Sequence, residues 1–414
     1  MPNNHGRVGA DAPAERGLWR LFGPAFVAAV AYVDPGNVAA NLTAGASYGY
    51  LLLWVLVAAN AMAVLIQYLS AKLGLVTGRT LPQLIGERLG TRSRLAFWAQ
   101  AEVVAAATDI AEVIGGALAL NLLFGVPLPL GGLIVGMVSM GLLTVHSRRG
   151  QRPFEFVIIA LLAIIAVGFT AGLFVAPVDW RGAAGGLVPG FAGPQTVLLA
   201  ASMLGATVMP HAIYLHSALA RDRHRAQPGS AVTARLLRAT RLDVAWSMAA
   251  AGGVNIAMLL LAAASLRGVD GTESIEGAHA ALSAQLGPAI ATVFAVGLLA
   301  SGLAATSVGA HAGAIIMEGL LVRRIPLVAR RVVTLIPALI ILAAGVDPTW
   351  ALVVSQVVLS LGIPFALIPL VRFTALRSLV GGYANHRVTT VIALIVAALI
   401  IALNAALIVI TLAG

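Results

Sequence analysis

The chain has 414 residues, of which 60% are hydrophobic and only 10% are charged. Soluble domains contain about 25% charged residues, so this composition excludes an ordinary soluble protein and indicates a chain that lies in a lipid bilayer. The net charge of +10 therefore indicates basic loops at a membrane surface rather than nucleic-acid binding, and the absence of cysteine excludes disulfides and thiolate metal sites.

Eleven apolar stretches approach or exceed the length of about 20 residues that a membrane-spanning helix needs. In chain order, the predicted spans are 19–46, 50–75, 95–124, 128–145, 154–176, 195–220, 238–266, 286–318, 331–346, 350–373 and 388–413. The first is not a secretory signal, because it contains an aspartate and a Pro-Gly pair. The polar residues 1–18 are predicted to form a disordered cytoplasmic tail.

Basic residues gather on alternate connections between these spans. Of the 26 Lys and Arg residues, 24 fall on one side of the predicted topology, and only Arg181 and Arg267 fall on the other. Cytoplasmic loops carry the excess of Lys and Arg in membrane proteins. The chain is therefore predicted to lie in the cytoplasmic membrane with its N-terminus in the cytoplasm and, because eleven is odd, its C-terminus outside.

The first span contains a predicted helix break at Asp34-Pro35-Gly36-Asn37. Proline removes a backbone donor and disfavours helical geometry in the preceding residue, while glycine permits unwinding. A simple proline kink would fit the same pattern, but it would not need an aspartate, whose burial in the membrane is costly unless it is paired or neutralised. Unwound backbone at this depth is tolerated where it lines a cavity, so the break predicts a binding site.

A second break is predicted in the sixth span, at Ala206-Thr207-Val208-Met209-Pro210-His211. Spans one and six head two successive groups of five, and because five is odd the second group crosses the membrane inverted. The fold is thus predicted to be all-α, with an inverted repeat of residues 19–176 and 195–373 followed by a last span at 388–413. In such folds the broken helices meet in the middle of the membrane and form the substrate and ion site.

Polar groups at the two breaks are typical of metal ligands. Asp34 offers an anionic oxygen, Asn37 an amide oxygen, and Ala206 a backbone carbonyl that unwinding sets free. Met209 adds a thioether, which shifts the preference from Mg²⁺ or Ca²⁺ toward transition metals. A lone buried methionine is usually a gap-filling core residue, but its position at the break favours metal ligation here.

Three further acids, Glu102, Asp109 and Glu112, lie in the third span at spacings of seven and three, near one face of a helix. With Asp34 they are the four acids that we assign to the membrane interior. A chain of carboxylates at this depth predicts a route for protons, although for Glu102 a neutral, hydrogen-bonded packing role is an equally good interpretation.

Two basic side chains, His211 and Arg331, are candidates for the same route. His211 is interpreted either as a group that exchanges protons with the acids or as a satisfied core histidine. At the start of span nine, Arg330 is interpreted as an orientation anchor, and Arg331 is expected to pair with a relay carboxylate and keep it ionised.

The motifs Asp34-Pro35-Gly36-Asn37 and Met209-Pro210-His211 resemble those of the Nramp family, proton-coupled manganese and iron transporters with a LeuT-type fold. The likeness extends through 107–112, 205–217 and 356–365, and the retained methionine differs from the magnesium-transporting branch. The resemblance implies that Asp34, Asn37, the Ala206 carbonyl and Met209 bind the metal, with Gln356 joining in some conformations. It also implies proton transfer by Asp109 and Glu112.

We therefore expect import of Mn²⁺ or Fe²⁺ by alternating access, coupled to protons, without a cofactor, nucleic acid or an obligate protein partner. An amino-acid or organic-cation symporter on the same fold is the alternative, although an aspartate in the first break would repel a substrate carboxylate. A membrane metallo-enzyme is disfavoured because the sequence has no H-E-x-x-H or similar His-rich ligand set. A pore-type channel is a further alternative, which saturable, proton-coupled uptake would exclude.

Overall fold

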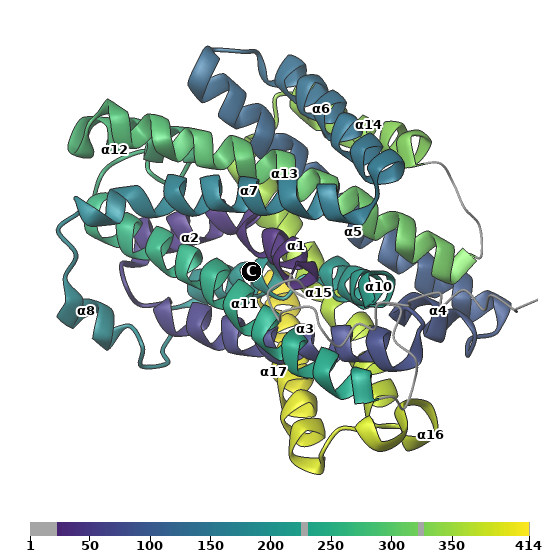
Figure 1. The fold of residues 1–414 in the computed structure, drawn as a ribbon. Coiled ribbons are helices and arrows are strands. Elements are labelled where there is room, and N and C mark those ends of the chain that lie inside the picture. The colour runs from purple at the N-terminus through teal and green to yellow at the C-terminus, as the bar shows by residue number, and fades with distance from the viewer. Residues whose placement is uncertain (1–22, 225–230, 322–326, 414) are drawn as a thin grey trace, which may run out of the picture.

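A computed structural model describes residues 23–224, 231–321 and 327–413 of the chain, and every element within these ranges is a helix (Figure 1). The tail predicted at 1–18 lies outside the described residues. The helices of the first half are α1 (Pro24–Val30), η3 (Ala31–Val33), α2 (Pro35–Tyr48), α3 (Leu53–Thr77), α4 (Leu81–Gly86), α5 (Thr91–Phe124), α6 (Leu128–Arg149), α7 (Gln151–Thr170), η4 (Ala171–Phe174) and α8 (Trp180–Gly185).

The second half begins with a pair of helices that correspond to the sixth span. Its helices are α9 (Pro194–Thr207), α10 (Pro210–His224), α11 (Ala231–Ser265), α12 (Ile275–Leu286), α13 (Pro288–Leu321), α14 (Leu327–Ala343), α15 (Pro348–Ala375), α16 (Arg377–Val380), η5 (Gly381–Tyr383) and α17 (Arg387–Ala413). Each of the predicted spans coincides with a helix or with a broken pair of helices.

Eight helices or helix pairs in the described part of the chain are long and apolar enough to cross a membrane. Two shorter apolar helices, Pro24–Val33 and Leu128–Thr144, accompany them. The multi-helix membrane architecture is thus confirmed, while the number of eleven spans stays a prediction.

Both predicted helix breaks are confirmed. Asp34 is extended, with φ −72° and ψ 168°, and it is the N-cap of α2, whose first residue is Pro35. The second break lies at Val208, which has φ −103° and ψ 69°, and Pro210 then begins α10. A proline at the first helical position costs no hydrogen bond, because that N–H has no partner within the helix anyway. The prolines therefore restart helices here rather than kink them.

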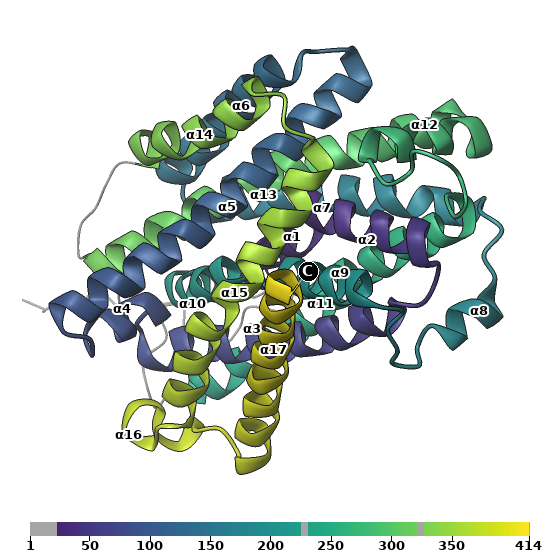
Figure 2. The ribbon, with the colours of Figure 1, turned by 180° about the vertical axis from the view of Figure 1, so that it is seen from behind.

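Small residues allow the central helices to approach closely. A Cβ added to Gly302 of α13 would lie 2.7 Å from the Cα of Gly116 on α5, and one added to Gly297 would lie 3.0 Å from the Cα of Gly168 on α7. Helices in a membrane associate through such close contacts between small residues, because the hydrophobic effect does not drive apolar helices together in lipid. In the two views, α1 and α2 lie in the middle of the bundle, while α17 runs along α15 (Figures 1 and 2).

Candidate substrate site at the two helix breaks

A hydrogen-bonded bridge joins the two broken helices. The side-chain nitrogen of Asn37 donates to Asp34 Oδ1 at 2.7 Å and to the carbonyl oxygen of Ala206 at 2.8 Å. The backbone N–H of Asn37 also donates to Asp34 Oδ1, at 2.8 Å, which caps α2. Thr207 donates to Asn37 Oδ1 at 3.5 Å. Three of the predicted ligand groups are therefore brought together.

A fourth predicted group reaches the same point from α15. Gln356 Nε2 donates to Asp34 Oδ2 at 3.3 Å, while Gln356 Oε1 is buried without a hydrogen-bond partner among the described residues. The side chain lies directly against the backbone of the first break, where a Cβ on Gly36 would overlap it. Glycine is therefore needed at this position for Gln356 to approach Asp34.

Met209, the fifth predicted ligand, is fully buried at the second break. It immediately precedes Pro210, the first residue of α10, and lies three residues beyond Ala206. The side chains of Asp34, Asn37 and Gln356 are also fully buried. A hydrated cation has no open path to these groups in this conformation, so access requires the helices to move.

The site differs from a conventional metal centre. Among the described residues, no group of three or more His, Cys, Asp or Glu side chains is placed to hold a metal ion. The candidate site instead combines one carboxylate with amide, carbonyl and thioether groups. These are weaker ligands than a cluster of anions, as suits an ion that must be released again.

The acids of the third span lie on α5 beside the site. Glu112 is fully buried, and neither of its carboxyl oxygens has a hydrogen-bond partner in the described part of the chain. It packs against α13, where a Cβ on Gly309 would lie 2.7 Å from Glu112 Oε2. The charged groups of Asp34, Asp109 and Arg331 are close enough to act on it electrostatically. Glu112 therefore lies close to both the first break and Asp109.

Arg331 pairs with Asp109, as expected. The two side chains are separated by 3.1 Å, and their exposed fractions are 0% and 2%. Arg331 Nε also donates to Ser139 Oγ on α6 at 3.0 Å. A buried pair of this kind is maintained only when both charges remain, because either one alone would be uncompensated.

Arg330, interpreted as an orientation anchor, also forms a buried ion pair that the sequence did not predict. Arg330 is buried and donates to Glu102 Oε1 at 2.8 Å. The helix α14 begins at Leu327 and not at 331, where the ninth span was predicted to begin. Arg330 therefore lies inside the helix and faces α5. The same pair shows that Glu102 is ion-paired rather than a neutral packing residue.

His211 lies at the start of α10 and is buried. Its Nδ1 is 3.4 Å from the hydroxyl of Thr108 on α5, which itself donates to the Val104 carbonyl. Its Nε2 has no hydrogen-bond partner within the described ranges. Only one of the two ring nitrogens therefore has a hydrogen-bond partner there. This disagrees with the interpretation of His211 as a core histidine with all its hydrogen bonds made.

The structure adds two buried acids that the sequence reasoning did not include among those of the membrane interior. Asp243 on α11 accepts hydrogen bonds from the backbone N–H of Gly23 at 3.3 Å and of Ala25 at 3.0 Å, which caps the start of α1. Glu155 on α7 lies 3.7 Å from Arg223 and accepts from Gln151. Both lie inside predicted spans, so counting every acid within each span would have found them.

A further polar network was not predicted at all. On α3, Gln67 Nε2 donates to the Tyr32 hydroxyl at 2.5 Å, and Gln67 Oε1 lies 2.7 Å from His216 Nδ1. On α11, Asn255 donates to the Tyr32 carbonyl at 2.7 Å, just before the first break. The sequence feature that could have indicated this network is a glutamine, Gln67, in the middle of an apolar span. The network ties the first break to α3, α10 and α11.

A bundle of apolar helices, two of which are interrupted where a buried polar site forms, defines a membrane transporter of the LeuT-type fold. The structure of Mhp1, a nucleobase-cation-symport-1 family transporter, has the same fold, with a TM-score of 0.61 at 17% identity, covering 96% of this chain and 92% of that one.

The family follows from closer similarities. A model described as natural resistance-associated macrophage protein-like (Nramp) matches residues 25–410. The divalent metal cation transporter MntH of Mycobacterium tuberculosis (strain ATCC 25618 / H37Rv) is 61% identical over 396 residues, which cover 96% of this chain and 92% of the relative. The crystal structure of the Eremococcus coleocola manganese transporter has a TM-score of 0.85 at 32% identity, covering 98% of this chain and 87% of that one. The chain belongs to the Nramp family, whose members are transporters and not enzymes.

Proposed function

We propose that this chain imports divalent transition metal ions, Mn²⁺ or Fe²⁺, across the cytoplasmic membrane and that protons move with them. The observation that carries the proposal is the convergence of Asp34, Asn37 and the Ala206 carbonyl at two helix breaks. The names of the relatives, a divalent metal cation transporter and a manganese transporter, support this cargo class.

The metal replaces the hydrogen-bonded bridge. In the present conformation the Asn37 amide hydrogens satisfy Asp34 and Ala206 O. A cation at that point takes both oxygens, and the Asn37 side chain turns so that its oxygen becomes a ligand. Met209 adds the thioether that favours transition metals over Ca²⁺ and Mg²⁺, and Gln356 can contribute its unpartnered oxygen. The ligands must be deprotonated to bind, so metal loading competes with protonation of Asp34.

Protons leave along α5. Glu112 receives the proton from Asp34 and passes it to Asp109, which pairs with Arg331. Glu102, paired with Arg330 and 23% exposed, forms the solvent-facing end of the route. His211, with its free Nε2, stands beside this route as an exchanging group. Separate paths for metal and proton allow both to move in one cycle.

The proposed orientation follows from the basic residues. The connections that carry 24 of the 26 Lys and Arg residues face the cytoplasm, which places the N-terminus inside and the C-terminus outside. Residues 19–176 and 195–373 form the two inverted halves, and the final span at 388–413 lies outside them. Alternating access then results from one half-bundle rocking against the other around the breaks. Metal ions and protons are the proposed partners, without a cofactor.

The test is uptake by the purified full chain in proteoliposomes with a pH-sensitive dye inside. We expect saturable Mn²⁺ uptake accompanied by internal acidification, abolished in Asp34→Ala and intact in Asp270→Ala, which removes an exposed carboxylate. Undiminished uptake by Asp34→Ala would refute the site. Uptake of amino acids or organic cations in place of the metal would favour the symporter alternative, and flux that does not saturate would favour a channel.

A further inference from the structure

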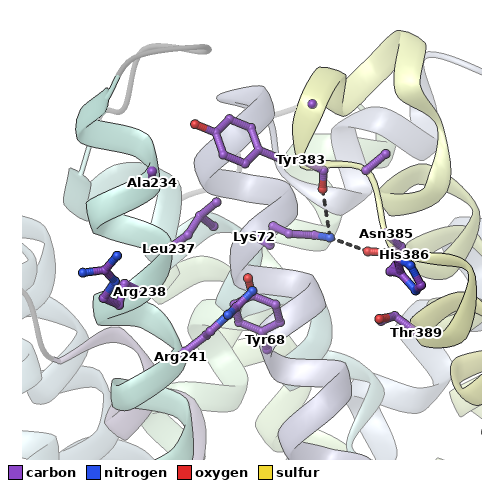
Figure 3. A pocket seen from close by; sticks show the side chains of 12 residues that line it. Tyr68, Lys72, Ala234, Leu237, Arg238, Arg241, Tyr383, Asn385, His386 and Thr389 are labelled. Atoms are coloured by element: carbon purple, nitrogen blue, oxygen red, sulfur yellow. Dashed lines mark hydrogen bonds between the residues drawn. The ribbon is translucent and has the colours of Figure 1, made fainter.

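A basic pocket of about 440 Å³ lies between α3, α11 and the connection from α16 to α17, and none of the residues that line it belongs to the helix breaks (Figure 3). Its basic side chains come from all three segments and are Lys72, Arg238, Arg241 and His386. The described residues that line it include no Asp or Glu. A cavity with several cations and no carboxylate attracts an anion.

The cations of this pocket are held in place by neighbours that do not neutralise them. Lys72 is 5% exposed, and its ammonium donates to the Tyr383 carbonyl at 3.2 Å and to the Asn385 side-chain oxygen. One of its three hydrogens remains for a ligand. The Arg241 guanidinium lies 5.1 Å from the centre of the Tyr68 ring. It makes no ion pair with another described residue, so its N–H edge is available to an anion.

More basic side chains lie at the same connection between α16 and α17. A second pocket of about 760 Å³ shares Gly382, Ala384, Asn385 and His386 with the first. It adds Arg377 and Arg387. Arg387 also begins α17, and the N-terminus of a long helix carries partial positive charge. Both pockets at this connection are therefore lined by basic side chains.

Apolar surface extends from the basic pocket along two helices. On α11, Arg238, Leu242 and Trp246 recur every four residues and so share a face, and the latter two are 41% and 63% exposed. On α17, the exposed Val388, Val391 and Ile392 follow the pocket residue His386. The surface therefore suits a molecule with an anionic head and hydrocarbon chains.

We propose that this pocket binds the phosphate group of an anionic phospholipid from the cytoplasmic leaflet. Arg238, Arg241 and Lys72 hold the phosphate, and the acyl chains lie along the apolar faces of α11 and α17. The site is separate from the metal and proton groups, and only its assignment to the cytoplasmic leaflet rests on the proposed orientation. A soluble phosphate has the same chemistry but would leave the apolar faces unused.

The test compares lipid binding by the purified full chain and by the double variant Arg238→Gln/Arg241→Gln. Native mass spectrometry and thermal unfolding are measured with phosphatidylglycerol, with phosphatidylcholine and with inorganic phosphate as separate probes. We expect phosphatidylglycerol to bind and stabilise the parent chain, phosphatidylcholine to do neither, and the double variant to bind phosphatidylglycerol on the order of tenfold more weakly. The control Arg181→Gln/Arg267→Gln removes the same charge from the opposite loops and should bind as the parent does.

Equal phosphatidylglycerol binding by the parent and the double variant, or equal binding of both lipids by the parent, would overturn the proposal. Stabilisation by inorganic phosphate alone, lost in the double variant, would keep the phosphate chemistry and replace the lipid by a soluble anion. Mn²⁺ uptake by the double variant shows that it is folded. If it does not fold, the single variant Arg238→Gln, which changes an exposed residue, provides the same comparison.

Discussion

The side-chain nitrogen of Asn37 donates to the carbonyl oxygen of Ala206 across 2.8 Å, although the two residues are 169 positions apart. This contact links the first helix break directly to the second. The same nitrogen donates to Asp34, so the two amide hydrogens of Asn37 bridge an oxygen of each break. The closed site is thus held together by hydrogen bonds in the place where we propose that a metal binds.

Replacing Asn37 by alanine should therefore weaken both the closed site and metal binding. We expect Mn²⁺ affinity to fall by roughly tenfold or more, because one of the proposed oxygen ligands is lost. Isothermal titration of Mn²⁺ into the purified variant measures this. Asn121→Ala, which removes an amide bonded only to the nearby Val126 carbonyl, is the control. Parent-like affinity in Asn37→Ala would contradict the ligand role.

Met209→Ala tests the source of selectivity. The thioether is the one soft ligand proposed at the site, and soft ligands favour transition metals over Ca²⁺ and Mg²⁺. We expect Mn²⁺ uptake to continue while Ca²⁺ and Mg²⁺ become transported or inhibitory. Uptake of each ion is measured in competition with Mn²⁺. If the variant discriminates between these ions as the parent does, Met209 is a packing residue only.

The helix breaks could be predicted from the sequence because their causes are local. Pro35 and Pro210 each begin a helix, and the Asp34 side chain caps the helix that Pro35 begins. Both effects act between residues that are adjacent or nearly adjacent in the sequence. The pairing of Arg331 with an acid was also predictable, since a buried charge needs a partner. These rules operate within a few residues or on charge alone, and they require no knowledge of which helices touch.

Other features depend on how distant helices pack, and sequence reasoning missed them. Arg330 and Glu102 are 228 positions apart, so their pairing follows only from the contact of α14 with α5. Likewise, Asp243 caps α1 from 218 positions away. The position of Gln356 beside Asp34 was implied by the family resemblance and not by any local pattern. Such contacts require the three-dimensional arrangement of the bundle.

Glu112→Gln should separate proton movement from metal movement. The amide has nearly the same shape as the acid but cannot release a proton, so we expect proton flux to fall at least tenfold while Mn²⁺ affinity changes by less than about threefold. Internal pH and Mn²⁺ uptake are recorded together in proteoliposomes. The exposed Glu87, which pairs with Arg79 at the surface, gives the control Glu87→Gln. Parent-like proton flux in Glu112→Gln would exclude the route along α5.

The buried pair of Arg331 and Asp109 makes a prediction about stability as well as transport. Removing one partner leaves the other charge buried and uncompensated, which costs about 3–5 kcal/mol in comparable pairs. We expect Arg331→Met to lower the midpoint of thermal unfolding strongly and to stop proton flux. The double variant Arg331→Met/Asp109→Leu should recover most of the stability, because no charge is left unpaired, but none of the proton flux.

Thermal unfolding in detergent and the pH-dye assay measure the two effects on the same protein samples. Recovery of both stability and proton flux in the double variant would show that the pair serves packing alone. If the double variant were as unstable as the single variant, the charges would not be the reason why these two residues depend on each other.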